Sequence, residues 1–198
     1  AGVKPIIGCE VYVARRGMSD RIYGVDNDPF HLVLLCKDRT GYENLCYLVS
    51  EAFTSGFYGK PRVDIALLQQ HHEGLIALSA CLAGAVPQHL MNEDYEAAKA
   101  YALNMAEIFG PDNYYLELQD HGIPEQRMVK QMVQRLARET GLPLVVTNDA
   151  HYLRKEDAKM QDVLLCIQTG KTVDDENRMR FSTEEFYLKS EEELRQLF

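Results

Sequence analysis

Acidic, imidazole and thiol side chains interrupt several apolar runs of this chain, and such interruptions are where chemistry is expected. Glu10 lies inside the strand-like run PIIGCEVYVA. A carboxylate there either faces solvent at a strand end or needs a partner or a metal ion, because burying an unpaired charge is costly. His31 begins the run HLVLLC, and Cys81 follows the run GLIALS. Taken alone, His31 also suits a strand end, and Cys81 also suits a small buried apolar position.

A D-x-H pair, Asp149 and His151, follows the strand-like run LVVT. Side chains two apart in an extended segment point the same way, so this acid and imidazole suit a divalent metal ion or an acid–base pair. The alternative is a capping aspartate beside an exposed histidine. Two further residues are candidates for contact with a substrate. His121 follows the run YYLEL, and Arg15 belongs to a short basic loop that also suits a solvated surface.

Apolar periodicity predicts short strands that alternate with amphipathic helices. Strands are expected at residues 5–14, 31–36, 74–79, 114–118 and 144–147. Helices are expected at residues 40–53, 64–70, 92–109, 124–140 and 156–169. Asp64 and Asn92 are the expected N-caps of two of them, and Gly110-Pro111 is an expected stop. Strands separated by helices of crossover length predict an α/β fold with a parallel sheet, as in a barrel or a doubly wound sheet.

Composition argues against several classes of protein. The 21 basic and 30 acidic residues give a net charge of −9, which disfavours a module that binds nucleic acid by neutralising phosphates. The Rossmann, P-loop and nucleophile-elbow motifs are absent from the sequence. No run of 18 apolar residues occurs, so no membrane partner is expected. The five cysteines form no C-x-x-C pair, which favours a reducing cytoplasm over a disulfide framework.

The chain resembles a known family over nearly its whole length. The stretches that carry the resemblance are KPIIGCEVYVA, FHLVLLCKDRTGYENLCYLVSEAF, GLIALSACLAG, LPLVVTNDAHYLRKEDA and EFYLKSEEEL. They are similar, in this order, to the polymerase-and-histidinol-phosphatase (PHP) domain at the N-terminus of the alpha subunits of bacterial DNA polymerase III, a replicative polymerase. The resemblance implies a distorted (β/α)7 barrel of the TIM type. Residues 1–175 are expected to form part of this barrel, and residues 176–198 a junction towards the polymerase palm domain.

The resemblance implies metal ligands at Glu10, His31, Asp149 and His151. Cys81 stands where many members of the family have histidine, and its thiol favours zinc, with manganese or magnesium as alternatives. The family's H-x-H strand and a later aspartate–histidine strand do not occur before Glu10. We therefore expect the chain to start downstream of the barrel's first strands, with an incomplete metal cluster. Exposed sheet edges would then favour self-association.

The resemblance also implies a function. The parent protein is expected to be a DNA-directed DNA polymerase, a nucleotidyltransferase of DNA replication, with DNA, deoxynucleoside triphosphates and other replisome subunits as partners. This part is expected to be a metal-dependent phosphoesterase, a 3′–5′ exonuclease or a pyrophosphatase, that uses a metal-activated water. A catalytically silent scaffold for the polymerase and a stand-alone PHP-type phosphatase are the alternatives. The polymerase-like stretches GYENL and EFYLKS argue against the stand-alone phosphatase.

Overall fold

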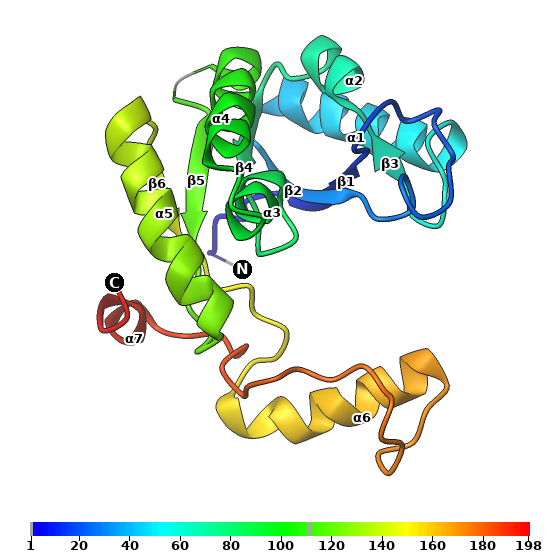
Figure 1. Ribbon diagram of the computed structural model, residues 1–198, viewed down its shortest axis with the longest axis vertical. Coiled ribbons are helices and arrows are strands. Elements are labelled where there is room, and N and C mark those ends of the chain that lie inside the picture. Colours follow the sequence, from blue (N-terminus) through cyan, green and yellow to red (C-terminus); the bar gives the residue numbers. More distant parts are fainter. Residues whose placement is uncertain (1, 111) are drawn as a thin grey trace. The chain divides into compact units, whose positions relative to one another are not determined.

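The computed structural model describes residues 2–110 and 112–198 and has an α/β fold (Figure 1). Its strands are β1 Gly8–Val13, β2 Phe30–Cys36, β3 Arg62–Val63, β4 Leu75–Leu78, β5 Tyr114–Leu118 and β6 Leu144–Val146. Its helices are α1 Arg39–Thr54, α2 Ile65–Gln70, α3 Ala85–Met91, α4 Tyr95–Phe109, α5 Pro124–Thr140, the 3-10 helix η1 Lys155–Asp157, α6 Ala158–Thr169 and α7 Glu191–Arg195. The chain divides into two compact units: the first runs to residue 117 and includes 132–145, and the second contains 118–131 and 146–198.

A mixed sheet has the strand order β3-β1-β2-β4-β5-β6. β1 is parallel to β3, and β4 is parallel to β5, whereas β2 is antiparallel to both β1 and β4. The predicted α/β class is confirmed, but the prediction of a wholly parallel sheet is wrong. The reason is the polar loop over residues 14–29, which joins β1 to β2 without a crossover helix and so returns the chain in the opposite direction. In the described part of the chain the sheet is open, and the TIM-like barrel is not closed.

The two faces of the sheet differ in burial. Residues that pair directly across two strands share a face, and the pair Val11 and Leu32 is buried, with exposed fractions of 5% and 2%. The pair Tyr12 and His31 lies on the opposite face and is half-buried, and Glu10 lies on that same face and is exposed. Helix α1 packs against strands β1 to β4. Polar ligand-type residues therefore occupy the open face of a sheet whose other face belongs to the core.

One of the two predicted N-caps is confirmed by the structure, and the other is wrong. Asp64 caps α2 as predicted, because its carboxylate accepts a hydrogen bond from a backbone N–H in the first turn. The prediction that Asn92 begins the next helix is wrong. Asn92 ends α3, and Asp94 caps α4, because the chain needs a tight turn through Glu93, whose φ is 60°, between the two helices. Gly110 ends α4 as predicted, and Pro111, the other half of that stop, lies outside the described residues.

Arg62 organises the polar loop over residues 14–29. It lies on β3, a strand of two residues that the sequence pattern does not predict, and its exposed fraction is 0%. Its guanidinium donates hydrogen bonds of 2.9–3.0 Å to the carbonyls of Met18, Asp20, Asp26 and Gly56. Burial lowers the pKa of Arg62, and the Asp26 carboxylate acts in the opposite direction. A buried cation thus satisfies backbone acceptors that a loop would otherwise leave unpaired.

Strands β3 and β6 stand at the two ends of the strand order. Both are short, which limits the row of unpaired backbone groups that each edge offers to another chain. The expected self-association of this chain stays a prediction. Among residues 2–110 and 112–198, no helix is long and apolar enough to cross a membrane.

Candidate metal centre

Three of the predicted ligands lie together in the first unit: Glu10 on β1, His31 near the start of β2, and Cys81 in the turn after β4. We call them the Glu10–His31–Cys81 cluster. Their ligand atoms all lie within 4.8 Å of one another. Oε1 of Glu10 is 3.1 Å from Nδ1 of His31, and Sγ of Cys81 is 3.6 Å from the same nitrogen. The antiparallel register makes this possible, because His31 pairs with Tyr12, two residues after Glu10 on the same face.

The neighbouring groups change the electrostatics of His31. The pKa of His31 is raised to about 10, mainly by the contact with Cys81 and next by the hydrogen bond with Glu10. Burial of the imidazole acts in the opposite direction. A bound metal ion would have to take the place of the proton between these groups, because a metal ligand must be deprotonated. The side chains of His31 and Glu10 are 26% and 41% exposed, so the cluster is open to solvent.

The turn after β4 fixes two of these ligands relative to each other. The N–H of His31 donates to the carbonyl of Ala83 at 3.0 Å, and the N–H of Gly84 donates to the carbonyl of Cys81 at 2.8 Å. Residue 84 must be small, because a Cβ on Gly84 would lie 2.1 Å from the carbonyl oxygen of Ser79. Backbone contacts therefore support the side-chain contact between His31 and Cys81.

Glu117 is a buried carboxylate next to the turn that carries Cys81, and it is not among the residues predicted from the sequence. It lies on β5 inside the run YYLEL, is 6% exposed, and accepts a hydrogen bond from the N–H of Ala80, the residue before Cys81. The signal that marks Glu10, a carboxylate inside an apolar run, also marks Glu117.

Asp149 and His151 lie in the second unit, and their side chains contact each other. Nε2 of His151 is 3.4 Å from Oδ1 of Asp149, with side chains that are 40% and 30% exposed. The φ of Asp149 is 42°, a region in which aspartate is tolerated better than most residues. The N–H of His151 donates to the carbonyl of Phe186 at 2.8 Å. That this pair joins the Glu10–His31–Cys81 cluster stays a prediction.

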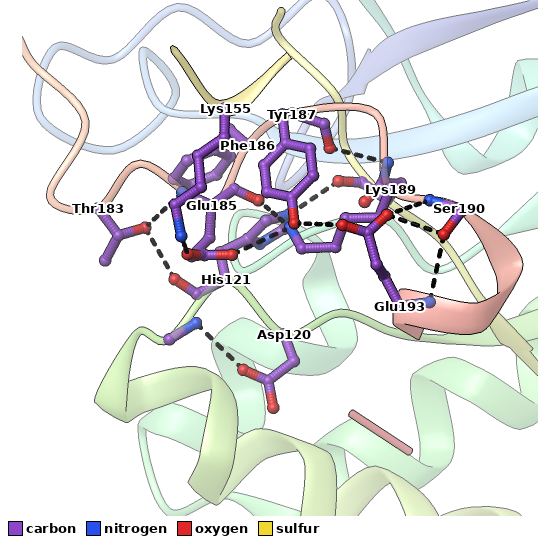
Figure 2. Close-up of polar contacts among 12 residues, drawn as sticks. Asp120, His121, Lys155, Thr183, Glu185, Phe186, Tyr187, Lys189, Ser190 and Glu193 are labelled. Atoms are coloured by element: carbon purple, nitrogen blue, oxygen red, sulfur yellow. Dashed lines mark hydrogen bonds and ion pairs between the residues drawn. The ribbon is translucent and has the colours of Figure 1, made fainter. Parts of the chain in front are cut away.

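Polar contacts in the second unit hold the segment that Phe186 belongs to (Figure 2). They join Thr183 to the carbonyl of His121, Lys155 to Glu185, Tyr187 to Glu193, and Ser190 to Glu193. The amine of Lys189 is buried and donates to the carbonyl of Glu185, and burial lowers its pKa. The segment over residues 183–190, which supports His151, is thus held by several contacts along its length.

His121 lies at the centre of the second unit, with 1% exposure. Its Nε2 is 2.8 Å from the carbonyl of Asn148, its Nδ1 is 2.8 Å from the amide of Gln126, and its ring stacks on Phe186 at 4.2 Å. Because Asn148 immediately precedes Asp149, these contacts support the turn that carries the D-x-H pair. They give His121 a structural role, and its contact with a substrate stays a prediction.

Arg15 lies just after β1, in the first unit. Its guanidinium donates to the carbonyl of Asp28 at 2.7 Å and to the carboxylate of the same residue at 3.0 Å, and it stands 4.2 Å above the ring of Phe30. These partners order the basic loop. A contact between Arg15 and a substrate also stays a prediction.

The donor set fits a zinc ion. Carboxylate, imidazole and thiolate are all zinc ligands, and a catalytic zinc site has three protein ligands with one open position. Tetrahedral bonds of about 2.0 Å to oxygen and nitrogen and about 2.3 Å to sulfur place the nitrogen ~3.3 Å from the oxygen and ~3.5 Å from the sulfur. The separations of 3.1 Å and 3.6 Å in the cluster are close to these values.

The family model described as the PHP domain matches residues 1–121, which is more than half of the 198 residues. The chain belongs to the PHP domain family. PHP domains are generally metal-dependent, and the Glu10–His31–Cys81 cluster gives this PHP domain a possible metal-binding triad.

Curated relatives match nearly the whole of this chain. It is 50% identical over 198 residues to the DNA polymerase III subunit alpha of Treponema pallidum, a match that covers 100% of this chain and 17% of the relative. It is 50% identical over 196 residues to the protein of the same name from Thermus aquaticus, covering 98% and 16% of the two chains. The corresponding protein of Deinococcus radiodurans is 48% identical over 197 residues, covering 97% and 15%. The chain spans about one sixth of the length of these relatives.

Proposed function

We propose that this PHP domain is part of the alpha subunit of a bacterial DNA polymerase III and that it binds zinc at the Glu10–His31–Cys81 cluster as a metal-dependent phosphoesterase. The observation that carries the proposal is the closeness of the three donor atoms, which all lie within 4.8 Å of one another, with Nδ1 of His31 3.1 Å from the Glu10 carboxylate and 3.6 Å from the Cys81 sulfur. The phosphoesterase reaction is the cleavage of a phosphodiester at a DNA 3′ end or of pyrophosphate.

Each residue of the cluster has a distinct part in this proposal. Cys81 supplies a thiolate, which selects zinc over harder ions such as magnesium. His31 and Glu10 supply nitrogen and oxygen ligands from neighbouring strands. Bound zinc would lower the pKa of a water molecule and so supply a nucleophile at neutral pH. Asp149 and His151 are the proposed additional ligands or the proposed acid–base pair.

For the parent protein we propose DNA-directed DNA polymerase activity in DNA replication, in the cytoplasm, with DNA, deoxynucleoside triphosphates and other replisome subunits as partners. The alignment of 97–100% of this chain with three relatives called DNA polymerase III subunit alpha supports this assignment. The same alignments disfavour a stand-alone phosphatase, since these relatives are about six times longer than the chain. Within this assignment, residues 1–175 are the proposed partial barrel and residues 176–198 the proposed junction to the polymerase parts.

Zinc titration of the purified 198-residue chain tests the metal site. Isothermal titration calorimetry of the wild type is expected to show one tight site. Cys81→Ala should weaken binding by roughly 100-fold or more, because it removes a direct ligand. Cys46→Ala is the matched control, since Cys46 is an exposed thiol on α1 outside the cluster. Equal zinc affinity of the Cys81→Ala and Cys46→Ala variants contradicts the metal site.

Hydrolysis assays separate the enzyme from the silent scaffold. The zinc-loaded and manganese-loaded chain is incubated with a 3′-labelled oligonucleotide and with pyrophosphate. The phosphoesterase is supported if the wild type releases a labelled nucleotide or phosphate and the Cys81→Ala variant does not. Tight zinc binding without any hydrolysis, also when the chain is part of the complete alpha subunit, supports the structural scaffold instead.

A further inference from the structure

Glu117 forms a reciprocal pair of hydrogen bonds with the turn that carries Cys81. Its carboxylate accepts from the N–H of Ala80, and its own N–H donates to Oγ of Ser79 at 2.8 Å. The backbone adds a third link, because the N–H of Ser79 donates to the carbonyl of Tyr115 at 3.0 Å. Ser79, Ala80 and Glu117 are buried, with exposed fractions of 3%, 3% and 6%. Strand β5 therefore holds the residues just before Cys81 by both backbone and side chain.

The backbone at Ala80 is in a conformation that alanine seldom adopts. Its φ is 64°, in the left-handed region where a Cβ clashes with the following carbonyl. Such a conformation persists only where surrounding contacts enforce it. The hydrogen bond from the Ala80 N–H to the Glu117 carboxylate acts directly on this peptide unit. The direction in which the chain enters Cys81 follows from this enforced turn.

We infer that Glu117 is a positioning residue for the Cys81 ligand: its carboxylate holds the Ala80 peptide so that the Cys81 thiol lies beside Nδ1 of His31. This inference rests on the proposed metal site and extends it to a residue outside the cluster. Glu117 acts through the Ala80 N–H and does not touch the ion. Outer residues that orient metal ligands commonly change affinity by about 10–100-fold when they are altered.

Two substitutions separate the acceptor from the bulk of the side chain. Glu117→Gln keeps an oxygen that can accept from the Ala80 N–H, whereas Glu117→Met has a similar size and offers no such acceptor. Glu107→Met is the matched control, because Glu107 is exposed on α4 and lies away from the turn. Circular dichroism melting of each variant of the 198-residue chain reports whether the fold is kept. If Glu117→Met does not fold, Glu117→Leu, which also removes the carboxylate that accepts from the Ala80 N–H, takes its place.

The first measurement uses metal-free protein. Hydrogen exchange of the Ala80 amide and the rate at which iodoacetamide alkylates Cys81 are followed by NMR and by peptide mass spectrometry. Glu117→Met is expected to speed exchange of the Ala80 amide and to change the alkylation rate of Cys81 several-fold, with no change in Glu107→Met. The inference is overturned if Glu117→Met folds and its Ala80 amide exchanges faster, but Cys81 is still alkylated at the wild-type rate.

The second measurement uses the metal. Zinc affinity is expected to fall about 10–100-fold in Glu117→Met, to stay close to wild type in Glu117→Gln, and to be unchanged in Glu107→Met. In the cobalt-substituted protein, the thiolate-to-cobalt absorption band should weaken in Glu117→Met alone. Wild-type affinity and an unchanged band in Glu117→Met overturn the positioning role. A wild-type chain that binds neither ion contradicts the proposed metal site, and the alkylation measurement then decides on Glu117 independently.

Discussion

The backbone N–H of His31 donates a hydrogen bond of 3.0 Å to the carbonyl of Ala83. His31 lies on β2 and Ala83 lies two residues after Cys81, so this bond joins the segments that carry two of the three clustered ligands. The geometry of the cluster therefore depends on backbone contacts that side-chain substitutions leave intact. A change that displaces the turn itself should move both ligands at once.

The substitution Gly84→Ala should displace this turn. The φ of Gly84 is −68°, which alanine adopts freely, so the effect would come from the added Cβ alone, 2.1 Å from the carbonyl oxygen of Ser79. We expect a loss of about 1–3 kcal/mol in the free energy of unfolding, as for other overpacked sites, together with weaker zinc binding. Urea unfolding and zinc titration measure the two effects. Gly17→Ala is the control, because a Cβ at residue 17 would make only ordinary van der Waals contacts. Equal free energies of unfolding for Gly84→Ala and Gly17→Ala would contradict this prediction.

Replacing the buried Arg62 should destabilise the first unit strongly. Arg62→Met leaves the four carbonyls of Met18, Asp20, Asp26 and Gly56 without their donor. We expect the free energy of unfolding to fall by about 3 kcal/mol or more, because each unsatisfied buried acceptor costs ~1–3 kcal/mol. Arg39→Met serves for comparison, since the Arg39 side chain is 82% exposed and should change stability by less than about 0.5 kcal/mol. Urea unfolding curves that coincide for the two variants would refute the role of Arg62.

Acid stability should depend on Asp26. The pKa of Asp26 is lowered to about 2, mainly by the hydrogen bonds that its carboxylate accepts from Arg16 and next by the bond from the Ile22 N–H. Because the folded pKa lies below the usual value of about 3.9, the ionised form stabilises the fold fully above pH ~4, and this contribution is lost as the pH falls to about 2.

Urea midpoints at pH 7, 4, 3 and 2 check this dependence. Asp26→Asn should be less stable than wild type at pH 7, and the difference should shrink between pH 4 and pH 2. Asp28→Asn is the control, because the Asp28 side chain is 82% exposed. A difference between wild type and Asp26→Asn that stays constant over this range would contradict the assignment.

Self-association, if it uses the sheet edge, should depend on β6. This strand is at the end of the strand order, and Leu144 is 39% exposed on it. We expect the wild-type chain to associate with increasing concentration in sedimentation velocity, and Leu144→Lys to reduce this, because a charge on an edge strand opposes pairing with another chain. Leu103→Lys on α4 and Ile167→Lys on α6 remove exposed apolar side chains elsewhere, with exposed fractions of 44% and 71%. Reduction by Ile167→Lys but not by Leu144→Lys would assign the contact to α6.

The sequence singled out the three residues of the cluster but not the way in which they meet. Glu10 stands out because a carboxylate in an apolar run needs a partner, whereas His31 and Cys81 are proposed as ligands through the resemblance to the PHP family. Their meeting depends on the reversal of β2, and a run such as HLVLLC carries no information about the direction in which it pairs. Periodicity is the same for parallel and antiparallel strands, so it does not give the direction of β2. The prediction of a parallel sheet rests on the helices of crossover length that separate most of the strands.

Two other differences have local causes. Asn92, Glu93 and Asp94 follow one another, and two of the three are good N-caps, so only the backbone turn at Glu93 decides which one begins α4. Arg62 lies in the polar stretch KPRVD, which is typical of a surface loop. Its burial follows from carbonyls that are 36 to 44 residues earlier in the chain, and no short-range pattern can predict such contacts.

The reversal of β2 also has a consequence for the order in which the site assembles. Glu10 and His31 lie on neighbouring strands joined by one loop, whereas Cys81 is 50 residues beyond His31. Contacts between segments close in sequence form faster, because less chain entropy is lost when they meet. During synthesis or refolding, the carboxylate and the imidazole should therefore come together as an early intermediate pair, and the thiol should complete the cluster in a later step. Pulse-labelling hydrogen exchange would show this as protection of β1 and β2 amides before those of β5.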